Sequence, residues 1–416
     1  MTPKLRVPSA ASRAVVVAVA WWSSSCSPSG FSAQSLLQSV RILASSADEP
    51  YARPGDQVHV TVLAYDGRPG DQRQGAPMNL TWLPASGAGQ VIPCINPPDD
   101  AYYGCFSRFR STSSALAPAG LQDAGASSAS PGGSQDAGAD SAVGPASGIA
   151  EGCPLDAAAC AANLEAGIAL PVMATSEFTM PLNVVTSHPP VAGTSPYGLA
   201  YLFNVACAGQ VQVVAPGPNP QQAPIGCFDD AGNALGSNDY VFGFTRVYSR
   251  LAPDGGYYAN ANPVITGVDL PPCTLAVPGS VPSFVAPPIA ALCTPSSCPR
   301  VTIGAIVPES SWELNPLNVD SNGNPLHEEI WADYYATFGG FNSQTRLLYD
   351  PSTGAVSGSD TEFEPPELGP SDVHDGFIFG VVYDDRGGES WVSIPTHVCS
   401  DPADPVCTAP SCSDGG

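Results

Sequence analysis

Apolar and polar residues alternate along several stretches of this 416-residue chain, which is the pattern of β-strands. The stretches that alternate most clearly are residues 58–64, 78–82, 197–207, 240–248, 329–338 and 377–383. The 45 prolines and 42 glycines leave little room for long helices, and we expect one short helix at residues 153–170. Short alternating runs between proline- and glycine-rich turns predict an all-β, antiparallel protein.

The composition changes sharply at residues 111–150, which consist mainly of Ala, Ser, Gly, Asp and Pro and contain no aromatic residue. Such a segment cannot bury enough apolar surface to offset its ordering entropy, so we expect it to be disordered. Strands on both sides of it are needed for a seven-stranded domain. The sequence therefore predicts a first β-sandwich at residues 36–261, with 111–150 as an insertion, and a second at residues 262–399. A cysteine-containing tail follows at residues 400–416. In the alternative partition the segment is a boundary and the chain has three domains.

The N-terminus has the layout of an export signal. Lys4, Arg6 and Arg13 come first, an apolar run follows at residues 14–22, and small residues lead to Cys26. The apolar run is shorter than the roughly 20 residues of a membrane-spanning helix. We expect residues 1–25 to be removed; the alternative is an ordinary secretory signal that is cleaved elsewhere.

Cysteine number and spacing predict disulfides. Without Cys26, 12 cysteines remain, an even number in a compartment where disulfides persist. Spacing suggests three pairs, Cys94–Cys105, Cys153–Cys160 and Cys207–Cys227. The other six can pair in 15 ways: Cys273, Cys293, Cys298, Cys399, Cys407 and Cys412. Two of their spacings are C-x4-C (293/298 and 407/412), so a zinc site is the alternative to disulfides there.

The negative net charge and the lack of lysine after residue 25 argue against nucleic-acid binding and Schiff-base chemistry. After removal of residues 1–25, the chain has 11 arginines, no lysine and 38 acidic residues, which gives a net charge near −27. A surface of this sign repels phosphate backbones, so we expect no nucleic-acid partner. Schiff-base chemistry has no lysine to use.

Motifs for catalysis are scarce in the chain. It has no G-x-S-x-G, no Walker A loop and no dinucleotide fingerprint after a strand, so we expect no enzyme and no cofactor. A hydrolase remains an alternative, either through Glu362 and Glu364, which would share one face of a strand, or through a triad assembled from distant strands.

A weak calcium candidate lies between two strands. Asp320, Asn322, Asn324 and Glu328 have the spacing of the start of an EF-hand loop. Pro325 and Trp331 replace the glycine and the bidentate glutamate of that motif. An Asn-Gly turn explains the same residues.

Several segments resemble known bacterial domains. Cys26 after small residues resembles the lipobox of bacterial lipoproteins, in which this cysteine is acylated and becomes the N-terminus, so that residues 26–35 form a tether. Ser27 in the following position implies the outer membrane. Residues 51–66 resemble the first strands of immunoglobulin-like domains, and residues 376–394 resemble the last hairpin of immunoglobulin-like and PKD-like domains.

As a whole, the chain is similar to cell-surface lipoproteins with immunoglobulin-like or PKD-like β-sandwich domains. The resemblance rests on residues 51–55, 94–105, 197–203, 226–232 and 331–335. We therefore expect a non-enzymatic, lipid-anchored cell-envelope protein with a binding or structural role, and an envelope protein or a glycan as its partner. The alternatives are a calcium-, glycan- or protein-binding adhesion module and an exported hydrolase.

Overall fold

The computed structural model describes most of the chain after residue 33. It covers residues 34–75, 77–84, 91–112, 169–270, 273–276, 283–285, 289–294, 297–356, 358, 360–369, 372–401, 403–404 and 407. For residues 74, 75, 110–112, 273–276 and 283–285 only the backbone is described. Residues 35–416 form one compact unit, and the account below concerns this unit alone.

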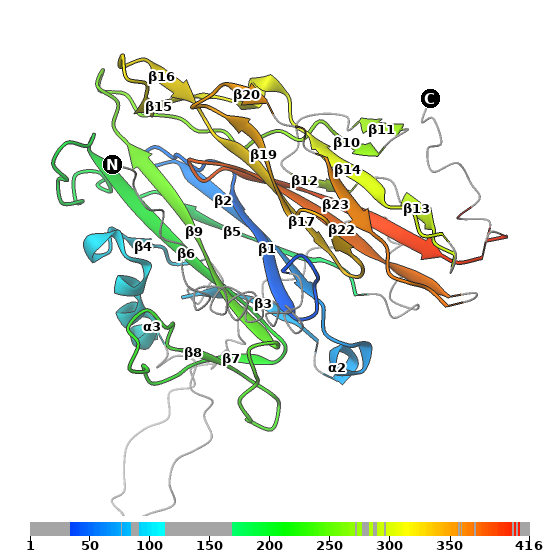
Figure 1. Ribbon diagram of the computed structural model, residues 1–416. Coiled ribbons are helices and arrows are strands. Elements are labelled where there is room, and N and C mark those ends of the chain that lie inside the picture. Colours follow the sequence, from blue (N-terminus) through cyan, green and yellow to red (C-terminus); the bar gives the residue numbers. More distant parts are fainter. Residues whose placement is uncertain are drawn as a thin grey trace, which may run out of the picture. The chain divides into compact units, whose positions relative to one another are not determined.

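The protein is all-β, and the first half of the chain builds two antiparallel sheets (Figure 1). In the first sheet the order is β1-β2-β5, formed by Val40–Ala47, Gln57–Asp66 and Val172–Thr179. In the second sheet, β6 pairs along its whole length with β9, and its other edge pairs with β3 and β4. These four strands are Tyr197–Cys207, Tyr240–Arg250, Asn79–Leu83 and Cys94–Ile95.

The first and second sheets pack against each other through alternate residues of their central strands. On β2, Val58, Val60, Val62 and Ala64 are buried, and they share one core with β6 residues of the opposite sheet, namely Ala200, Leu202 and Ala206. Successive side chains on a strand point to opposite faces, so this core accounts for only half of each central strand.

The outer face of the second sheet is covered by short elements that two disulfides attach. Leu199, Tyr201, Phe203, Val205 and Cys207 of β6 lie on this face and are buried. They are covered by helix α3 (Phe106–Thr112) and the hairpin of β7 (Gln210–Val213) with β8 (Ile225–Phe228). Cys94–Cys105 and Cys207–Cys227 join these covering elements to the sheet.

The second half of the chain builds the third and fourth sheets. The third has the order β12-β23-β22-β17-β19-β20, with β13 also beside β23. Its strands are Ser283–Val285, Glu389–Cys399, Val373–Asp384, Ile330–Ala336, Thr345–Asp350, Ala355–Val356 and Ile289–Leu292. The fourth sheet has the order β11-β10-β14-β21-β18. Its strands are Cys273–Ala276, Gly267–Leu270, Val301–Ile306, Thr361–Glu364 and Gly340–Phe341.

The third and fourth sheets share a core of their own. It includes Ile303 and Phe363 from the fourth sheet with Ile330 and Ile378 from the third. The backbone N–H of Ala305 donates to the Tyr334 hydroxyl at 2.9 Å, which ties the two sheets together within this core. The hairpin of β15 (Leu314–Val319) with β16 (Pro325–His327) and the helix α2 (Gly70–Gly75) also lie outside the four sheets.

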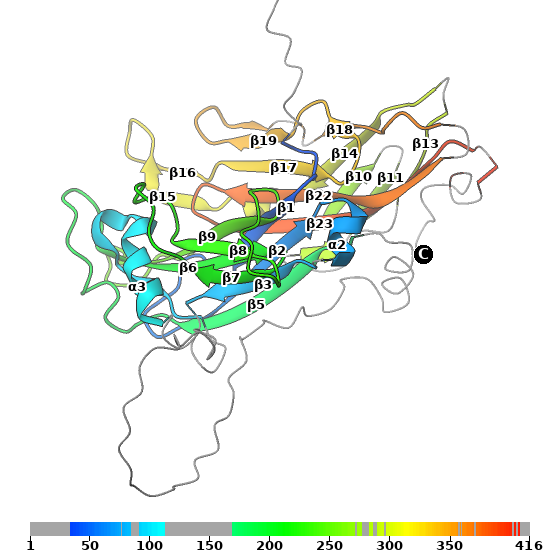
Figure 2. The same ribbon diagram turned by 90° about the horizontal axis from the view of Figure 1, so that it is seen from below.

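The first and third sheets also pack against each other. Leu63 and Tyr65 of β2 share a core with Phe377, Phe379 and Val381 of β22. The Tyr65 and Phe379 rings lie 5.7 Å apart. The four sheets therefore form consecutive layers, in the order second, first, third, fourth, and in Figure 2 the yellow to red strands of the second half lie above the blue to green strands of the first half. The two inner layers are buried on both faces where β2 meets β22, whereas His59 and Thr175 of the first sheet are exposed.

The strand predictions agree with the structure, and the antiparallel prediction needs one correction. Each of the six alternating stretches contains a strand. However, β12 and β13 run parallel to β23. Parallel neighbours need a crossover connection, and this segment indeed arrives after β11 of the fourth sheet rather than through a hairpin from β23.

Strands from both sides of the predicted insertion pair with each other. Gln57–Asp66 precedes it and Val172–Thr179 follows it, and the two are hydrogen-bonded neighbours in the first sheet. Ser111 and Thr112, which we expected to be disordered, belong to α3. Residues 113–150 and the predicted helix up to residue 168 lie outside the described residues. In the part of the chain that the structure describes, no helix has the length and apolarity to cross a membrane.

We predict that replacing both Cys207 and Cys227 by alanine lowers the free energy of unfolding by about 3 kcal/mol, because their bond closes a 20-residue span of the unfolded chain. The matched control replaces Cys293 and Cys298, which are five residues apart. Its loss should be about 1 kcal/mol smaller, since a shorter loop restrains the unfolded chain less. Urea unfolding of the oxidised proteins measures both, and an equal or reversed order contradicts the loop-closure account.

Candidate functional site

A disulfide-closed loop lies over the outer face of the second sheet. Cys94 and Cys105 have Cα atoms 5.8 Å apart, and the chain between them forms the short helices η1 (Pro98–Asp100) and η2 (Tyr102–Cys105). Three of its non-glycine residues have positive φ, namely Asn96 (45°), Asp99 (55°) and Asp100 (54°). Asn and Asp tolerate this conformation best, yet it still costs free energy, and such residues concentrate at functional sites.

Backbone groups of β6 and of the segment before it, together with the Tyr201 side chain, hold this strained loop in place. Asn96 Nδ2 donates to Val184 O at 2.7 Å, and Asn96 Oδ1 accepts from Leu199 N at 2.8 Å. Asp100 O accepts from the Tyr201 hydroxyl at 2.7 Å. The loop is therefore fixed at both ends of its strained portion.

The Asp100 carboxylate joins a histidine and a tyrosine. Oδ1 lies 2.7 Å from His188 Nε2, and Oδ2 accepts from the Tyr197 hydroxyl. His188 Nδ1 lies 2.7 Å from Pro189 O, so both ring nitrogens face acceptors. Burial, then the contact with Asp100, raises the pKa of Tyr197 to about 12, which keeps its hydroxyl a donor.

The loop presents aromatic rings beside strand β9. The Tyr102 ring stacks on the Phe244 ring with centroids 4.8 Å apart, and it meets Tyr103 edge-on at 5.7 Å. Tyr103 and Phe244 are each 37% exposed. Arg246 is exposed two residues beyond Phe244 and so lies on the same face of β9. We call Tyr102, Tyr103, Phe244 and Arg246 the aromatic ledge.

A second polar cluster, the junction network, lies where the chain passes from the first half to the second. Arg386 is buried, and its Nη2 donates to Glu313 at 2.8 Å and its Nη1 to Ala259 O at 2.9 Å. Its Nε donates to Glu328. The guanidinium also lies 5.5 Å from the centre of the Tyr51 ring. Arg386 thus binds the connecting segment and both halves at once.

Burial is the main cause of the raised pKa values of the carboxyl groups in the junction network. Glu328 is fully buried, and burial raises its pKa to about 8 although the Arg386 charge opposes this. Burial likewise raises the pKa of Asp384, whose Oδ1 accepts two backbone N–H bonds in the β22–β23 turn. Glu389 accepts a 2.8 Å hydrogen bond from Ser45 N, and burial raises its pKa to about 7. All of these groups bind protein partners, so the network acts as a clamp between the halves.

The calcium candidates are only partly brought together. Asp320 Oδ1 accepts from the backbone N–H groups of Asn322 and Asn324, each at 2.8 Å. The hydrogen bond from the Asn324 side-chain amide, followed by these backbone bonds, lowers the pKa of Asp320 to about 2. Gly323 has a φ of 85° in the same turn. The Glu328 carboxylate is instead bound by Arg386. Calcium binding stays a prediction.

The structure also shows the partners of the predicted glutamate pair and of most predicted disulfide cysteines. Glu362 and Glu364 share one face of β21, and both contact Arg300, the former at 2.8 Å. Disulfides join Cys94–Cys105, Cys207–Cys227, Cys293–Cys298 and Cys399–Cys407. Outside the described residues lie Cys26, Cys153, Cys160 and Cys412, and the Cys273 side chain is not described. In the zinc cage that was the alternative to disulfides at the two C-x4-C spacings, Cys293 and Cys298 are instead joined to each other, and Cys407 is joined to Cys399.

Sequence reasoning did not find the aromatic ledge or the junction network. Tyr102 and Tyr103 stand between two cysteines in a turn-rich loop, which is the one local signal for the ledge. The contacts of Arg386 join residues up to 127 positions apart, so no local pattern could have revealed them.

A cavity of about 210 Å³ opens at one edge of the first sheet, beside residues 91–93. Its polar walls are Gln57 and Glu177, which hydrogen-bond to each other at 2.7 Å. This volume lies below the usual 300–1,000 Å³ of small-molecule sites.

Comparisons with known proteins identify no family. No family model matches the chain, and no curated protein matches it. Among solved structures, the chain is similar to dimeric latent PorU from Porphyromonas gingivalis, at 12% identity and a TM-score of 0.18. The match covers 88% of this chain and 20% of that one. The chain thus spans about a fifth of that protein, and so low a score carries no argument about fold or function.

The raised pKa of Glu389 predicts a pH dependence of stability. The folded pKa of about 7 exceeds the ordinary 4.5, so folding takes up a proton between these values. The contribution is complete below about pH 4.5 and is lost as the pH rises through 7. We expect Glu389→Gln to gain about 1–2 kcal/mol of stability over the wild type between about pH 5 and 8.

Glu362→Gln is the control for this prediction, because Glu362 is a half-exposed carboxylate. Its pH profile in urea unfolding should follow that of the wild type. A Glu389→Gln profile parallel to the wild type would show that this carboxyl does not titrate on unfolding in that range.

Proposed function

We propose that this protein is a non-enzymatic, lipid-anchored binding protein of the cell envelope, held at the outer membrane through Cys26. The observation that carries the binding role is the aromatic ledge, which stands on a loop fixed by a disulfide and by hydrogen bonds to Asn96 and Asp100. A loop that is already ordered loses little conformational entropy on binding. Tyr and Arg are also the residues that most often dominate binding energy.

The architecture that we propose is two immunoglobulin-like sandwiches, formed by the first and second sheets and by the third and fourth. Each pair of sheets has its own core, which supports this division. In such sandwiches the loops carry recognition while the sheets hold them in position.

The cellular location is supported by the disulfides. Four pairs among the described cysteines are bonded, which is typical of oxidising, extracytoplasmic compartments. The tether is supported by the order of basic, apolar and small residues before Cys26.

For the ligand we favour an uncharged glycan of the envelope. Stacked rings offer flat apolar faces to sugar rings, and Arg246 adds hydrogen-bond donors. The excess of acidic residues, 38 against 14 basic ones, disfavours anionic polymers. In the Asp100–His188 pair both ring nitrogens face acceptors, which supports binding without turnover.

We predict that the protein co-sediments with an insoluble neutral polysaccharide, tested with cellulose and chitin. Tyr103→Ala and Phe244→Ala should each weaken binding at least about five-fold, as expected for a contact worth about 1 kcal/mol. Leu182→Ala is the matched control, since Leu182 is an apolar side chain that is 83% exposed elsewhere. Binding that all three variants retain equally would place any glycan site away from the ledge.

We also predict that the mature protein begins at an acylated Cys26. Intact-mass measurement of the membrane fraction should show a diacyl or triacyl addition, and Cys26→Ala should move the protein to the soluble fraction. Each buried methylene adds about 0.8 kcal/mol, so two or three chains hold the protein firmly. An unmodified N-terminus downstream of residue 26 would contradict the tether and leave the ledge prediction standing.

A further inference from the structure

The C-terminal end of β23 carries a cluster of metal-binding side chains. The ligand atoms of His397, Cys399 and Cys407 all lie within 4.8 Å of one another. His397 and Cys399 are two residues apart on β23 and so project from one face of the strand. Cys407 returns to them after a turn in which Asp404 N donates to Asp401 O. Within the described part of the chain, this is the one such group of three or more ligands.

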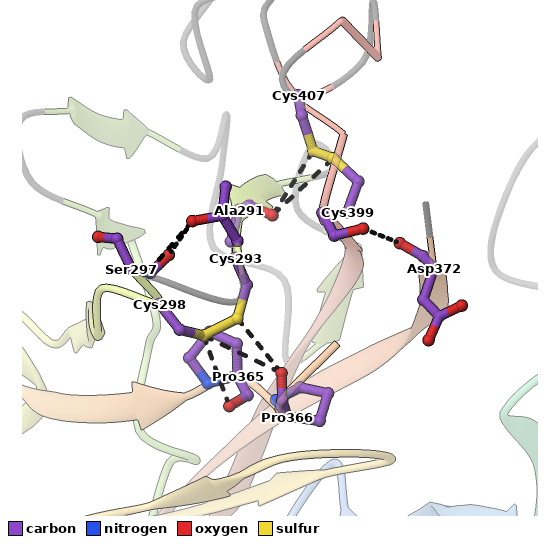
Figure 3. Close-up of a disulfide and its surroundings, with 11 residues drawn as sticks. Ala291, Cys293, Ser297, Cys298, Pro365, Pro366, Asp372, Cys399 and Cys407 are labelled. Carbon is purple, nitrogen blue, oxygen red and sulfur yellow. Dashed lines mark hydrogen bonds between the residues drawn. A yellow bond between two sulfur atoms is a disulfide. The ribbon is translucent and has the colours of Figure 1, made fainter. Parts of the chain in front are cut away.

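In the oxidised protein two of these ligands are bonded to each other. Cys399 and Cys407 form a disulfide, and Figure 3 shows its sulfurs beside the carbonyl group of Ala291 on the neighbouring strand β13. Cys399 is fully buried, whereas Cys407 is partly exposed. Solvent therefore reaches the bond from the Cys407 side.

The imidazole of His397 is oriented as a metal ligand would be. Its Nδ1 lies 2.6 Å from Asp375 Oδ1, on the residue that pairs with it across β22 and β23. This contact assigns the proton to Nδ1 and leaves a lone pair on Nε2. Nε2 is buried and makes no hydrogen bond, and Asp404 Oδ2 lies 3.5 Å from it. A buried nitrogen without a hydrogen bond costs free energy that a bound cation would recover.

We propose that reduction of the Cys399–Cys407 disulfide converts this cluster into a zinc site. The ligands are His397 Nε2, the two sulfurs and an Asp404 oxygen, a set of one nitrogen, two sulfurs and one oxygen that suits tetrahedral Zn²⁺. Asp375 acts behind His397 as the positioning carboxylate that zinc-bound histidines commonly have. The proposal is independent of the glycan-binding role and of the lipid tether.

The switch is a thiol–disulfide exchange with a dithiol reductant. One thiolate of the reductant attacks the Cys407 sulfur, the S–S bond breaks and Cys399 leaves as a thiolate. The second thiol of the reductant then attacks the mixed disulfide, which releases Cys407 and leaves the reductant as its own disulfide. The reductant supplies both electrons and both protons. Zn²⁺ then binds the cysteines as thiolates and displaces those two protons.

The other disulfides lack these features. Cys105, Cys207 and Cys227 are fully or almost fully buried, so a reductant reaches them poorly. Cys298 is exposed, but the sulfurs of Cys293 and Cys298 face the carbonyl groups of Pro365 and Pro366 (Figure 3). Cys293–Cys298 is therefore the matched control, an accessible disulfide without a histidine in its cluster.

The experiment uses the full chain in two redox states. Protein is left oxidised or reduced with a dithiol, freed of reductant under anaerobic conditions, and titrated with Co²⁺ and then Zn²⁺. The reduced protein should bind one Co²⁺ with thiolate charge-transfer and tetrahedral absorption bands, which one equivalent of Zn²⁺ abolishes. Zn²⁺ binding should release two protons per ion. The oxidised protein should show none of these signals, and this comparison needs no substitution.

Variants then assign the ligands. Cys399→Ser with Cys407→Ser should abolish the cobalt bands, and His397→Ala should weaken binding at least about 100-fold. Asp375→Ala should weaken it about 10–100-fold, as for other carboxylates behind a zinc-bound histidine. Cys293→Ser with Cys298→Ser should leave the affinity unchanged. Circular dichroism and melting of each oxidised variant verify the fold.

Three results from the wild type and the ligand variants would overturn the proposal, and a fourth comes from the control. The first three are reduced wild type without thiolate–cobalt bands, cobalt bands that survive in the Cys399→Ser, Cys407→Ser protein, and equal affinity of His397→Ala and the wild type. Loss of the bands in the Cys293→Ser, Cys298→Ser control would likewise place the metal at the other pair.

Discussion

The burial of both faces of β2 and β22, the strands through which the two inner sheets meet, is the constraint on which the rest of this structure depends. The first sheet packs against the second through Val58, Val60 and Val62, and against the third through Leu63 and Tyr65. The third sheet packs onward against the fourth through Ile378 and Val382. Apolar side chains on opposite faces of single strands thus connect three cores in series. Because each core supports the next, the two halves of the chain form one unit despite separate sheets.

Joining two halves brings charged groups into the interior, and the junction network gives Arg386 its partners, although Glu328 Oε2 makes no hydrogen bond. Arg386 enters a buried position only because carboxylates, the Ala259 carbonyl and the Tyr51 ring surround it. A buried charge without such partners would cost several kcal/mol. The same contacts fix the connecting segment, so the relation between the halves is set by paired charges as well as by apolar burial. The loop between Cys94 and Cys105 is therefore carried on a frame whose two halves are fixed to each other.

Two disulfides lie in the layer that covers the second sheet. Cys94–Cys105 and Cys207–Cys227 hold the thin layer that covers the second sheet, where short elements alone bury little area. The first of them also preserves the strained backbone at Asn96, Asp99 and Asp100 that carries the aromatic ledge. At the far end of the chain, Cys399–Cys407 closes a turn beside His397. The two disulfides that brace covering elements thus lie in the first half of the chain, and the disulfide beside a histidine lies near its end.

The sequence by itself determined the all-β class, the main strands and two of the disulfides. Period-two alternation reports which residues share a face, and Cys207 was placed on the apolar face of Tyr197–Cys207 for that reason. The near-continuous apolar run at residues 377–383 also contained a sign of burial on both faces, since Ile378 and Val382 alternate with Phe377, Phe379 and Val381.

Only the tertiary structure decided how the layers stack, that β12 and β13 run parallel to β23, and which charges meet at the junction. It alone brought Asp100 to His188, and Arg386 to Glu328, across 88 and 58 positions of the chain. The physical reason is that alternation records the environment of each face but not the identity of the partner. Partners are selected when sheets pack and buried polar groups must find one another.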